Sequence, residues 1–280
     1  MTGELRVLDT ITVRHMPFEF PDEIDPVFIR GDHRSSFTFI AGSLLLPHLE
    51  PYLIRTMREA RKHVTDPDIL AGLDAFSAQE GHHARMHRKF NDAVQRAGFP
   101  GLAEMEQKLS DDYRRFSDTK SLRFNLAYAE GFEALTMNAV KLLMEPNGFG
   151  EDLPDYMQLV EWHFLEELEH RHVTFDVYDH VCAGYFYRSA VGAWAQWHFS
   201  SWIRRVAAYM LKRNPPSRRA AKEALKDGGV MQGPVQPPVL EMIKILFRIH
   251  SPSYSPHNVE IAPGIQALAH KYSAMATKIS

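Results

Sequence analysis

The sequence predicts an all-α protein. Apolar residues recur with the period of a helix over long segments, and the signals of strands are nearly absent. Of 280 residues, 45% are hydrophobic and 24% are charged, and the net charge is −3. This composition is typical of a globular protein, and the length is sufficient to bury a large core. We therefore expect a single domain built from packed helices.

The first third of the sequence predicts an irregular arm and two long helices. Residues 1–35 contain Pro17, Pro21 and Pro26 without a helical period, which indicates a mostly extended N-terminal arm. A helical pattern fills residues 35–64, where Pro47 and Pro51 are expected to kink the helix or to mark its true start. A second helix is expected from Asp66, as its N-cap, with Pro67 in its first turn, to Ala97, and it ends at Gly98. The prolines and the expected N-cap thus mark the bounds of the arm and of the two helices.

The remaining segments also read as helices. A short polar helix is expected over residues 101–116, and two long helices over 119–145 and 155–181. A tryptophan-rich fifth helix over 186–212 is interpreted as a core or dimer-interface helix, with a membrane-facing helix and the wall of an apolar substrate channel as alternatives. Residues 36–213 then form the bundle. Residues 214–280 form a linker and a C-terminal extension, with helices near 238–249 and 264–278, packed on the bundle.

Composition excludes several classes of function. The charge balance shows no basic excess, so we expect no nucleic-acid partner. Cys182 is the only cysteine, which excludes an internal disulfide and a thiolate zinc site. No apolar run reaches the roughly 18 residues of a membrane span, and the N-terminus has no apolar signal segment. A cytoplasmic protein without a membrane span is the expectation.

Histidine and glutamate are concentrated in two of the predicted long helices. The segment "WHFLEELEHRH" (162–172) holds three histidines and three glutamates. Within it, His163, Glu167 and His170 are spaced i, i+4, i+7 and therefore lie along one helix face. In the second helix, Glu80 and His83 are spaced i, i+3. The Glu-x-x-His spacing also occurs at 169/172, so the spacing alone is weak evidence of a site.

The other two long helices each supply a glutamate among apolar neighbours. Glu50 lies in "LLLPHLEPYLI" and Glu133 in "LAYAEGFEALTM". A carboxylate in a bundle interior is costly unless it is paired or binds a metal. One Glu from each of two helices and Glu-x-x-His from each of the other two is the ligand set of ferritin-like dinuclear carboxylate proteins. The sequence therefore predicts a ferritin-like four-helix bundle with a metal site, and a buried salt-bridge network is the alternative.

Seven residues form the predicted ligand set, and other polar residues are expected around it. The ligands are Glu50, Glu80, His83, Glu133, His163, Glu167 and His170. For His163, the alternatives to a direct bond with the metal are a hydrogen bond to a ligand and a contact with substrate. His87, Glu130 and Asp176 are expected to support the ligands through hydrogen bonds. Glu166 and Glu169 are expected to be solvated or paired with Arg85 or Arg171, and His82, His172 and His180 to be structural or exposed.

The ligand chemistry predicts the metal. Carboxylates with a few imidazoles suit iron or manganese, and bridging glutamates can hold two cations close together. Zinc usually takes fewer ligands in a tetrahedral site. We therefore expect two iron ions, with manganese or a mixed Mn/Fe pair as alternatives.

At these residues the chain resembles the bacterial "predicted metal-dependent hydrolase" family of ferritin-like proteins. The segments "SAQEGHHARMHRKFN" and "WHFLEELEHRHVTFDVY" are similar to that family's "QExxHxxxHxxxN" and "HxxEExEHKxVAFDVY", and "VRHMPFEFPDEI", "FEALT" and "SPSYSPHNVEI" match three further blocks in the same order. The spacing of the seven ligands also resembles that of di-iron arylamine N-oxygenases. This second resemblance implies iron and O₂ chemistry without implying the same substrate.

Three functions follow from this site. The main expectation is an O₂-dependent oxidation of a small, hydrophobic organic substrate, which needs an electron donor. The first alternative is a dinuclear hydrolase of an ester or amide. The second alternative is non-enzymatic iron binding or storage. A homodimer is left open, and the sequence singles out no catalytic proton donor.

Overall fold

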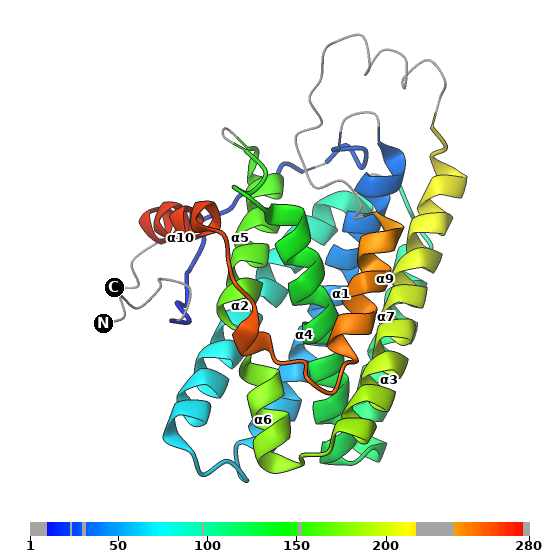
Figure 1. Ribbon diagram of the computed structural model, residues 1–280. Helices are drawn as coiled ribbons and strands as arrows, with labels where there is room; N and C mark the ends of the chain where they lie inside the picture. Colours follow the sequence, from blue (N-terminus) through cyan, green and yellow to red (C-terminus); the bar gives the residue numbers. More distant parts are fainter. Residues whose placement is uncertain are drawn as a thin grey trace.

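The computed structural model describes residues 10–22, 24–29, 32–96, 98–150, 153–216 and 238–276. These residues form helices and connecting segments without a strand, which confirms the all-α helical bundle (Figure 1). The elements are α1 (His33–Ala60), α2 (Pro67–Arg96), α3 (Leu102–Thr119), α4 (Leu122–Met144), α5 (Asp155–Glu169), α6 (Val173–Val181), α7 (Tyr185–Arg213), α9 (Val239–Ile249), the 3₁₀ turn η2 (Pro256–Asn258) and α10 (Pro263–Met275). Residues 10–22 and 24–29 contain no helix, as expected for an arm. Most of the predicted linker lies outside the described residues.

Helix α1 continues through both of its prolines. It begins at His33, where the Asp32 side chain accepts a hydrogen bond from the Ser35 amide, so neither proline marks its start. Pro47 and Pro51 cannot donate to the carbonyls of Ser43 and Pro47. The neighbouring helix α2 supplies the missing donors: Asn91 Nδ2 lies 2.9 Å from Ser43 O, and Arg88 Nη2 lies 3.3 Å from Pro47 O. The tertiary contact thus satisfies both freed carbonyls.

Helix α2 begins and ends where the sequence signals predict. The Asp66 side chain accepts hydrogen bonds from the amides of Asp68, at 2.9 Å, and Ile69, at 3.3 Å. Gly98 follows the helix with a φ of 102°, a conformation that glycine adopts without strain. This helix lies against α1 along its length, which brings the face of Glu80 and His83 toward the bundle interior.

The predicted fourth long helix is divided in two, which corrects the expectation of one helix over 155–181. Helix α5 ends at Glu169 and α6 begins at Val173, with His170 as the C-cap of α5. The Val173 amide donates to His170 O at 3.0 Å, which closes the turn between them. The sequence has no glycine or proline at this break, so the usual signals of a helix end are missing.

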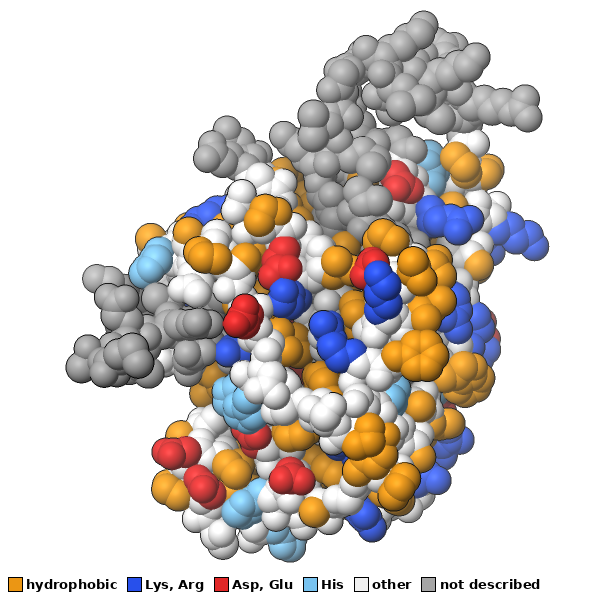
Figure 2. All heavy atoms as spheres, viewed as in Figure 1, with side chains coloured by type: hydrophobic (Ala, Val, Ile, Leu, Met, Phe, Trp, Pro, Cys, Tyr) orange, Lys and Arg blue, Asp and Glu red, His pale blue; other side chains and the backbone are white. Residues whose placement is uncertain are grey.

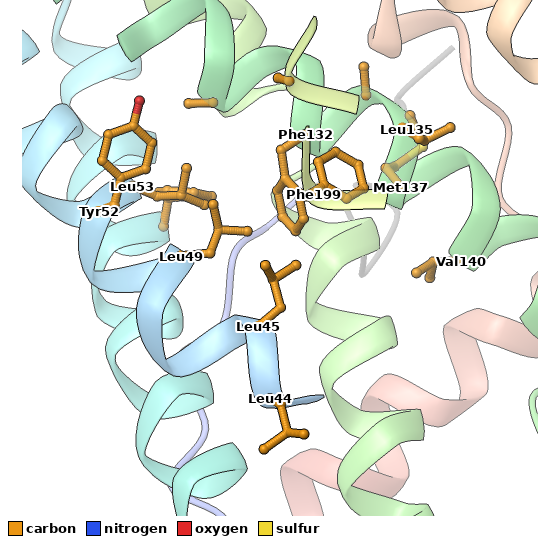
Figure 3. Packing of buried hydrophobic residues seen from close by; sticks show 14 of the residues in the cluster. Leu44, Leu45, Leu49, Tyr52, Leu53, Phe132, Leu135, Met137, Val140 and Phe199 are labelled. Atoms are coloured by element: carbon orange, nitrogen blue, oxygen red, sulfur yellow. The ribbon is translucent and has the colours of Figure 1, made fainter. Parts of the chain in front are cut away.

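One part of the hydrophobic core lies where α1, α4 and α7 meet. Leu45 and Leu49 of α1 point toward Phe132 of α4 and Phe199 of α7, whose rings pack edge to face at 5.1 Å (Figure 3). Helices α4 and α7 approach each other most closely at two glycines. A Cβ on Gly131 would lie 2.3 Å from the Cα of Gly192, so this contact requires glycine. This close approach of α4 to α7 sets the position of Glu133, which follows Gly131 on α4, within the bundle.

The tryptophan-rich helix α7 is partly core and partly surface. Trp202 is buried, Trp194 stacks on His198, and Trp197 is 61% exposed. Helix α9 beside it exposes Val239, Leu240, Ile243, Leu246 and Phe247, and Figure 2 shows hydrophobic side chains gathered on this side of the molecule. Among the described helices, only α1 is long and apolar enough for a membrane span by length and composition. Because 61% of its apolar window is buried in the bundle, it also fits the description of a core helix.

Candidate metal centre

Seven polar side chains from α1, α2, α4 and α5 converge inside the bundle. None of them is more than 2% exposed. Helix α1 supplies one glutamate, α2 a glutamate and a histidine, α4 one glutamate, and α5 with its C-cap the remaining three residues. The set consists of Glu50, Glu80, His83, Glu133, His163, Glu167 and His170. The structure thus brings together all seven residues that the sequence analysis selected as ligands.

The carboxylates and imidazoles face one another across short distances. His170 Nε2 lies 3.3 Å from Glu167 Oε2, 3.4 Å from Glu133 Oε2 and 3.5 Å from Glu80 Oε1. His163 Nε2 lies 2.8 Å from Glu167 Oε1 and 3.7 Å from Glu50 Oε1. Glu167 therefore lies between two of the histidines, with one oxygen directed at each. Glu167 would thus help to hold a metal ion together with His163 or His170.

Many of these atoms have no hydrogen-bond partner although they are fully buried. They are both oxygens of Glu50 and of Glu133, one oxygen each of Glu80 and Glu167, and the nitrogens His83 Nδ1 and His170 Nε2. Buried polar atoms are nearly always satisfied, and unpaired buried charge is strongly destabilising. Overlapping groups of three donors, each within 4.8 Å, can be drawn from these residues: Glu50/His83/His163, Glu80/His83/Glu167 and Glu80/Glu133/His170. These groups therefore offer the donor atoms that a bound metal ion needs.

Each of the three histidines is fixed by a hydrogen bond on its other nitrogen. His170 directs Nδ1 to Gln79 Oε1 at 3.0 Å, and the Gln79 amide in turn donates to Glu169 Oε2 at 3.0 Å. His83 directs Nε2 to Glu166 Oε2 at 3.0 Å. With the proton on the outer nitrogen, the inner nitrogen of each ring offers its lone pair to the centre. This is the arrangement that orients metal-bound histidines in proteins.

His163 is held by a chain of polar residues that ends on α1. Its Nδ1 lies 2.7 Å from His87 Nε2, and His87 Nδ1 lies 2.8 Å from Ser43 Oγ. The Ser43 hydroxyl donates to Asn91 Oδ1 at 2.6 Å. If His163 Nε2 faces a metal, each donor in this chain has one acceptor and each acceptor has one donor. His87 thus occupies the supporting position that the sequence analysis expected.

Arg14 of the N-terminal arm joins two of these supporting groups. Its Nη1 lies 3.0 Å from Glu166 Oε1 and its Nη2 lies 2.7 Å from Glu169 Oε1, and all three side chains are at most 2% exposed. The expectation that Glu166 and Glu169 are solvated is therefore wrong, and the arginine that pairs with both is Arg14 of the arm, which the alternative of a pair with Arg85 or Arg171 did not include. Trp162 Nε1 also donates to Glu166 Oε1, at 2.8 Å. Sequence reasoning missed these partners because no local spacing connects residue 14 with residues 166 and 169.

The electrostatics of the cluster reflect its burial. Burial, together with repulsion from Glu80 for Glu50 and from Glu167 for Glu133, raises the pKa of both carboxyls well above the ordinary value. Burial opposes protonation of His83, but its contacts with Glu166 and Glu80 raise the pKa of the ring to about 10. In the absence of metal ions, these groups thus favour holding protons at the centre. Cations would replace those protons.

Two of the expected supporting residues lie elsewhere. Glu130 Oε1 lies 2.5 Å from Arg188 Nη1, so its carboxylate is directed at α7 and contacts none of the seven residues. Burial raises the pKa of Glu130 to about 7, although Arg188 acts in the opposite direction. Asp176 hydrogen-bonds His172 and His257, and Gln79 orients His170 instead. The break after α5 explains the difference, because it interrupts the helical register between His170 and Asp176.

An apolar cavity of about 470 Å³ adjoins the centre. His87 and His163 form part of its wall, and the rest is largely hydrophobic, including Phe39, Leu135 and Val160. The α7 residues in the wall are Phe199, Ser200, Ile203 and Arg204, so the tryptophans of this helix do not line it. Its volume lies in the roughly 300–1,000 Å³ range of small-molecule sites. A ligand in the cavity would contact the ring of His163.

Comparison with known proteins agrees with a metal-dependent enzyme. No curated protein and no solved structure matches the chain. The sequence model of one family, described as predicted metal-dependent hydrolase, matches residues 12–260. This match includes the arm residue Arg14, the seven buried residues of the centre and the η2 turn. The chain therefore belongs to the family of predicted metal-dependent hydrolases.

Proposed function

We propose that this protein is an enzyme with a dinuclear metal centre that acts on a small apolar molecule held in the adjoining cavity. The observation that carries the proposal is the convergence, from separate helices, of fully buried carboxylate and imidazole atoms that lack a hydrogen-bond partner. Metal ions at this point would replace the protons that these buried groups otherwise hold, and would compensate the charge of the carboxylates. The family description supports the dependence on metal.

Hydrolysis is the first candidate reaction, because the family description names a hydrolase. We propose an ester or an amide as the bond that is cleaved. A bound metal pair supplies Lewis acidity toward a carbonyl oxygen and lowers the pKa of water. The residues of the chain would do the rest. The cavity wall would hold the apolar part of the substrate next to His163, while the chain through His87, Ser43 and Asn91 keeps the His163 ring in one orientation.

Oxidation with O₂ is the second candidate, and the donor set favours it. Four carboxylates and three imidazoles suit iron or manganese better than zinc. The candidate ligands are excluded from solvent, and the cavity beside them is mainly apolar, which protects a reactive oxidant from side reactions. This reading needs an electron donor. It also predicts a substrate with an oxidisable apolar group rather than a scissile acyl bond.

Metal analysis tests the centre itself. Protein from iron-supplemented cells is expected to contain two metal ions per chain, and Glu133→Gln is expected to lower this value while the helix content is unchanged. Glu106→Gln on α3 is the matched control, since Glu106 is also a buried carboxylate but bonds Gln95 outside the centre. Wild-type protein that retains fewer than one metal ion per chain after loading would refute the dinuclear centre.

A second experiment separates the two reactions. The Fe(II) protein is mixed with O₂ in a stopped-flow instrument, and the metal-loaded protein is assayed with p-nitrophenyl esters of increasing acyl length. Ester turnover that requires both metal and Glu133, with no O₂ consumption, supports hydrolysis. A transient absorbance on O₂ addition that is lost in Glu133→Gln, without ester turnover, supports oxidation.

Self-association is also open to test. The exposed side chains of α9, including Val239, Leu240 and Phe247, form an apolar face. Exposed apolar faces of this kind often bind another protein surface. We propose a homodimer through this face, and light scattering of wild type and Phe247→Glu is the measurement.

A further inference from the structure

A second cluster of metal-ligand side chains lies away from the buried centre, between α6 and the η2 turn. His172 is the N-cap of α6, Asp176 lies in its first turn, and His257 belongs to η2. The side chains of His172, Asp176 and His257 are 28%, 24% and 51% exposed, respectively. None of the three contacts the seven residues of the buried centre through a hydrogen bond or ion pair.

The carboxylate of Asp176 is shared between the two histidines. Its Oδ2 lies 2.9 Å from His172 Nδ1, and its Oδ1 lies 2.7 Å from His257 Nε2. The two rings are nearly parallel, with centroids 4.9 Å apart and an interplanar angle of 21°. Both imidazoles therefore direct a nitrogen at the same carboxylate from the same side. One ligand atom from each of the three residues lies within 4.8 Å of the others.

Space for further ligands adjoins these atoms. A cavity of about 230 Å³ is lined by His172, Asp176 and His257, and by Asp68 and Ile69 of α2. Two imidazoles and one carboxylate leave a tetrahedral ion with a fourth position, which a water molecule in this cavity can occupy. Exposed sites with two histidines and a carboxylate suit Zn²⁺, whose bonds to such ligands are about 2.0–2.2 Å. The two rings would have to move only slightly away from the Asp176 carboxylate for an ion with bonds of that length to fit between them.

The cluster joins parts of the chain that are distant in sequence. After α9, the chain crosses the outside of the bundle, passes α6 at η2 and continues to α10 (Figure 1). Histidine side chains and carboxylates lie close together on this face of the molecule (Figure 2). The bond between His257 and Asp176 spans 81 residues. An ion bound there would fix the crossing segment to α6.

We propose that His172, Asp176 and His257 bind a Zn²⁺ ion that fastens the crossing segment to the bundle, and that this site is independent of the buried centre. The proposal does not depend on which reaction the buried centre carries out. It requires only that the three ligand atoms are accessible to a hydrated cation, as their exposure indicates.

The test is a calorimetric titration of Zn²⁺ into untagged, iron-loaded protein. Wild type is expected to bind one equivalent of Zn²⁺ without loss of iron. His257→Ala is expected to lose this equivalent, with unchanged iron content, because His257 is exposed and remote from the iron ligands. His270→Ala is the matched control, since His270 is an exposed histidine on α10 outside the cluster, and it is expected to bind Zn²⁺ as wild type does.

A second measurement reports on the geometry of the site. Co²⁺ in place of Zn²⁺ is expected to give the intense visible bands of a four-coordinate ion in wild type and in His270→Ala, and to lose them in Asp176→Asn. Zinc binding that survives both His257→Ala and Asp176→Asn would overturn the proposal. Displacement of iron by the added equivalent of zinc would do the same, because it would assign that equivalent to the buried centre.

Discussion

Asn91 donates a hydrogen bond from its side-chain amide to the carbonyl oxygen of Ser43 at 2.9 Å. This carbonyl is the one that Pro47 leaves without its donor inside α1. Asn91 also accepts a hydrogen bond from the Ser43 hydroxyl, which in turn contacts His87. One side chain of α2 therefore satisfies a free carbonyl in the helix that carries Glu50, and it also accepts the last hydrogen bond of the polar chain that orients His163.

We predict that Asn91→Leu destabilises the protein by about 1–3 kcal/mol, the usual cost of a buried group left unsatisfied. Part of this loss is expected to disappear in the background of Pro47→Ala, because an alanine amide can donate to Ser43 O itself. The measurement is a double-mutant cycle of urea unfolding. A coupling free energy near zero would mean that the Ser43 carbonyl does not need Asn91.

Replacement of Arg14 should affect both stability and metal affinity. Arg14→Met leaves Glu166 and Glu169 buried without their cation, which is expected to cost about 3–5 kcal/mol. Because these carboxylates support His83 directly and His170 through Gln79, metal affinity should also fall about 10–100-fold. The measurements are denaturant unfolding and competition with a chelator. Arg58→Met, at an exposed position of α1, is the control and should leave both quantities unchanged.

Glu133→Gln should have opposite effects on the metal-free and the metal-loaded protein. Both oxygens of Glu133 are buried without a hydrogen-bond partner, and Glu167 repels its charge. Without metal, the raised pKa of Glu133 means that folding must either protonate this carboxyl or bury its charge, and the neutral glutamine avoids that cost, so the melting temperature is expected to rise. With metal, loss of a ligand is expected to lower it below that of wild type. Calorimetric scans with and without chelator measure both effects, and a lower melting temperature in both conditions would contradict the prediction.

The pH dependence of stability should contain a contribution from His198. Burial lowers the pKa of His198 below 6.5, so the unfolded chain takes up a proton at pH values where the folded protein does not. The stabilisation is therefore complete above pH 6.5 and is lost as the pH falls below that value. His198→Gln is expected to reduce the slope of unfolding free energy against pH below pH 6.5. An unchanged slope would show that this ring titrates alike in both states.

Filling of the cavity should separate substrate binding from metal binding. Ala139 lies in the cavity wall on α4, and Ala139→Trp is expected to reduce its volume without a change in metal content. Once a substrate is known, KM should rise for large substrates more than for small ones. Equal effects on substrates of all sizes would indicate that the cavity does not hold the reacting molecule.

The sequence predicted the parts of this structure that depend on local spacing. Helical periodicity located the long helices, and the Glu-x-x-His pairs with Glu50 and Glu133 identified a set of side chains that the structure brings together. Arg14 and Gln79 escaped notice because their partners lie far away in sequence: the Gln79–Glu169 hydrogen bond spans 90 residues. The break at His170 also escaped, because the turn carries no residue that disfavours a helix. The sequence thus left open the long-range hydrogen bonds and the break between α5 and α6.

The position of Arg14 has a consequence for synthesis of the protein. Besides its two carboxylates, Arg14 donates from Nε to Ser273 Oγ at 3.0 Å, a contact that spans 259 residues. The lining of the metal centre is therefore incomplete until a residue of α10 has emerged from the ribosome. A nascent chain that ends before this helix can bring the seven inner side chains together, but Arg14 then lacks its hydrogen bond to Ser273. We expect stable metal uptake to follow translation rather than accompany it.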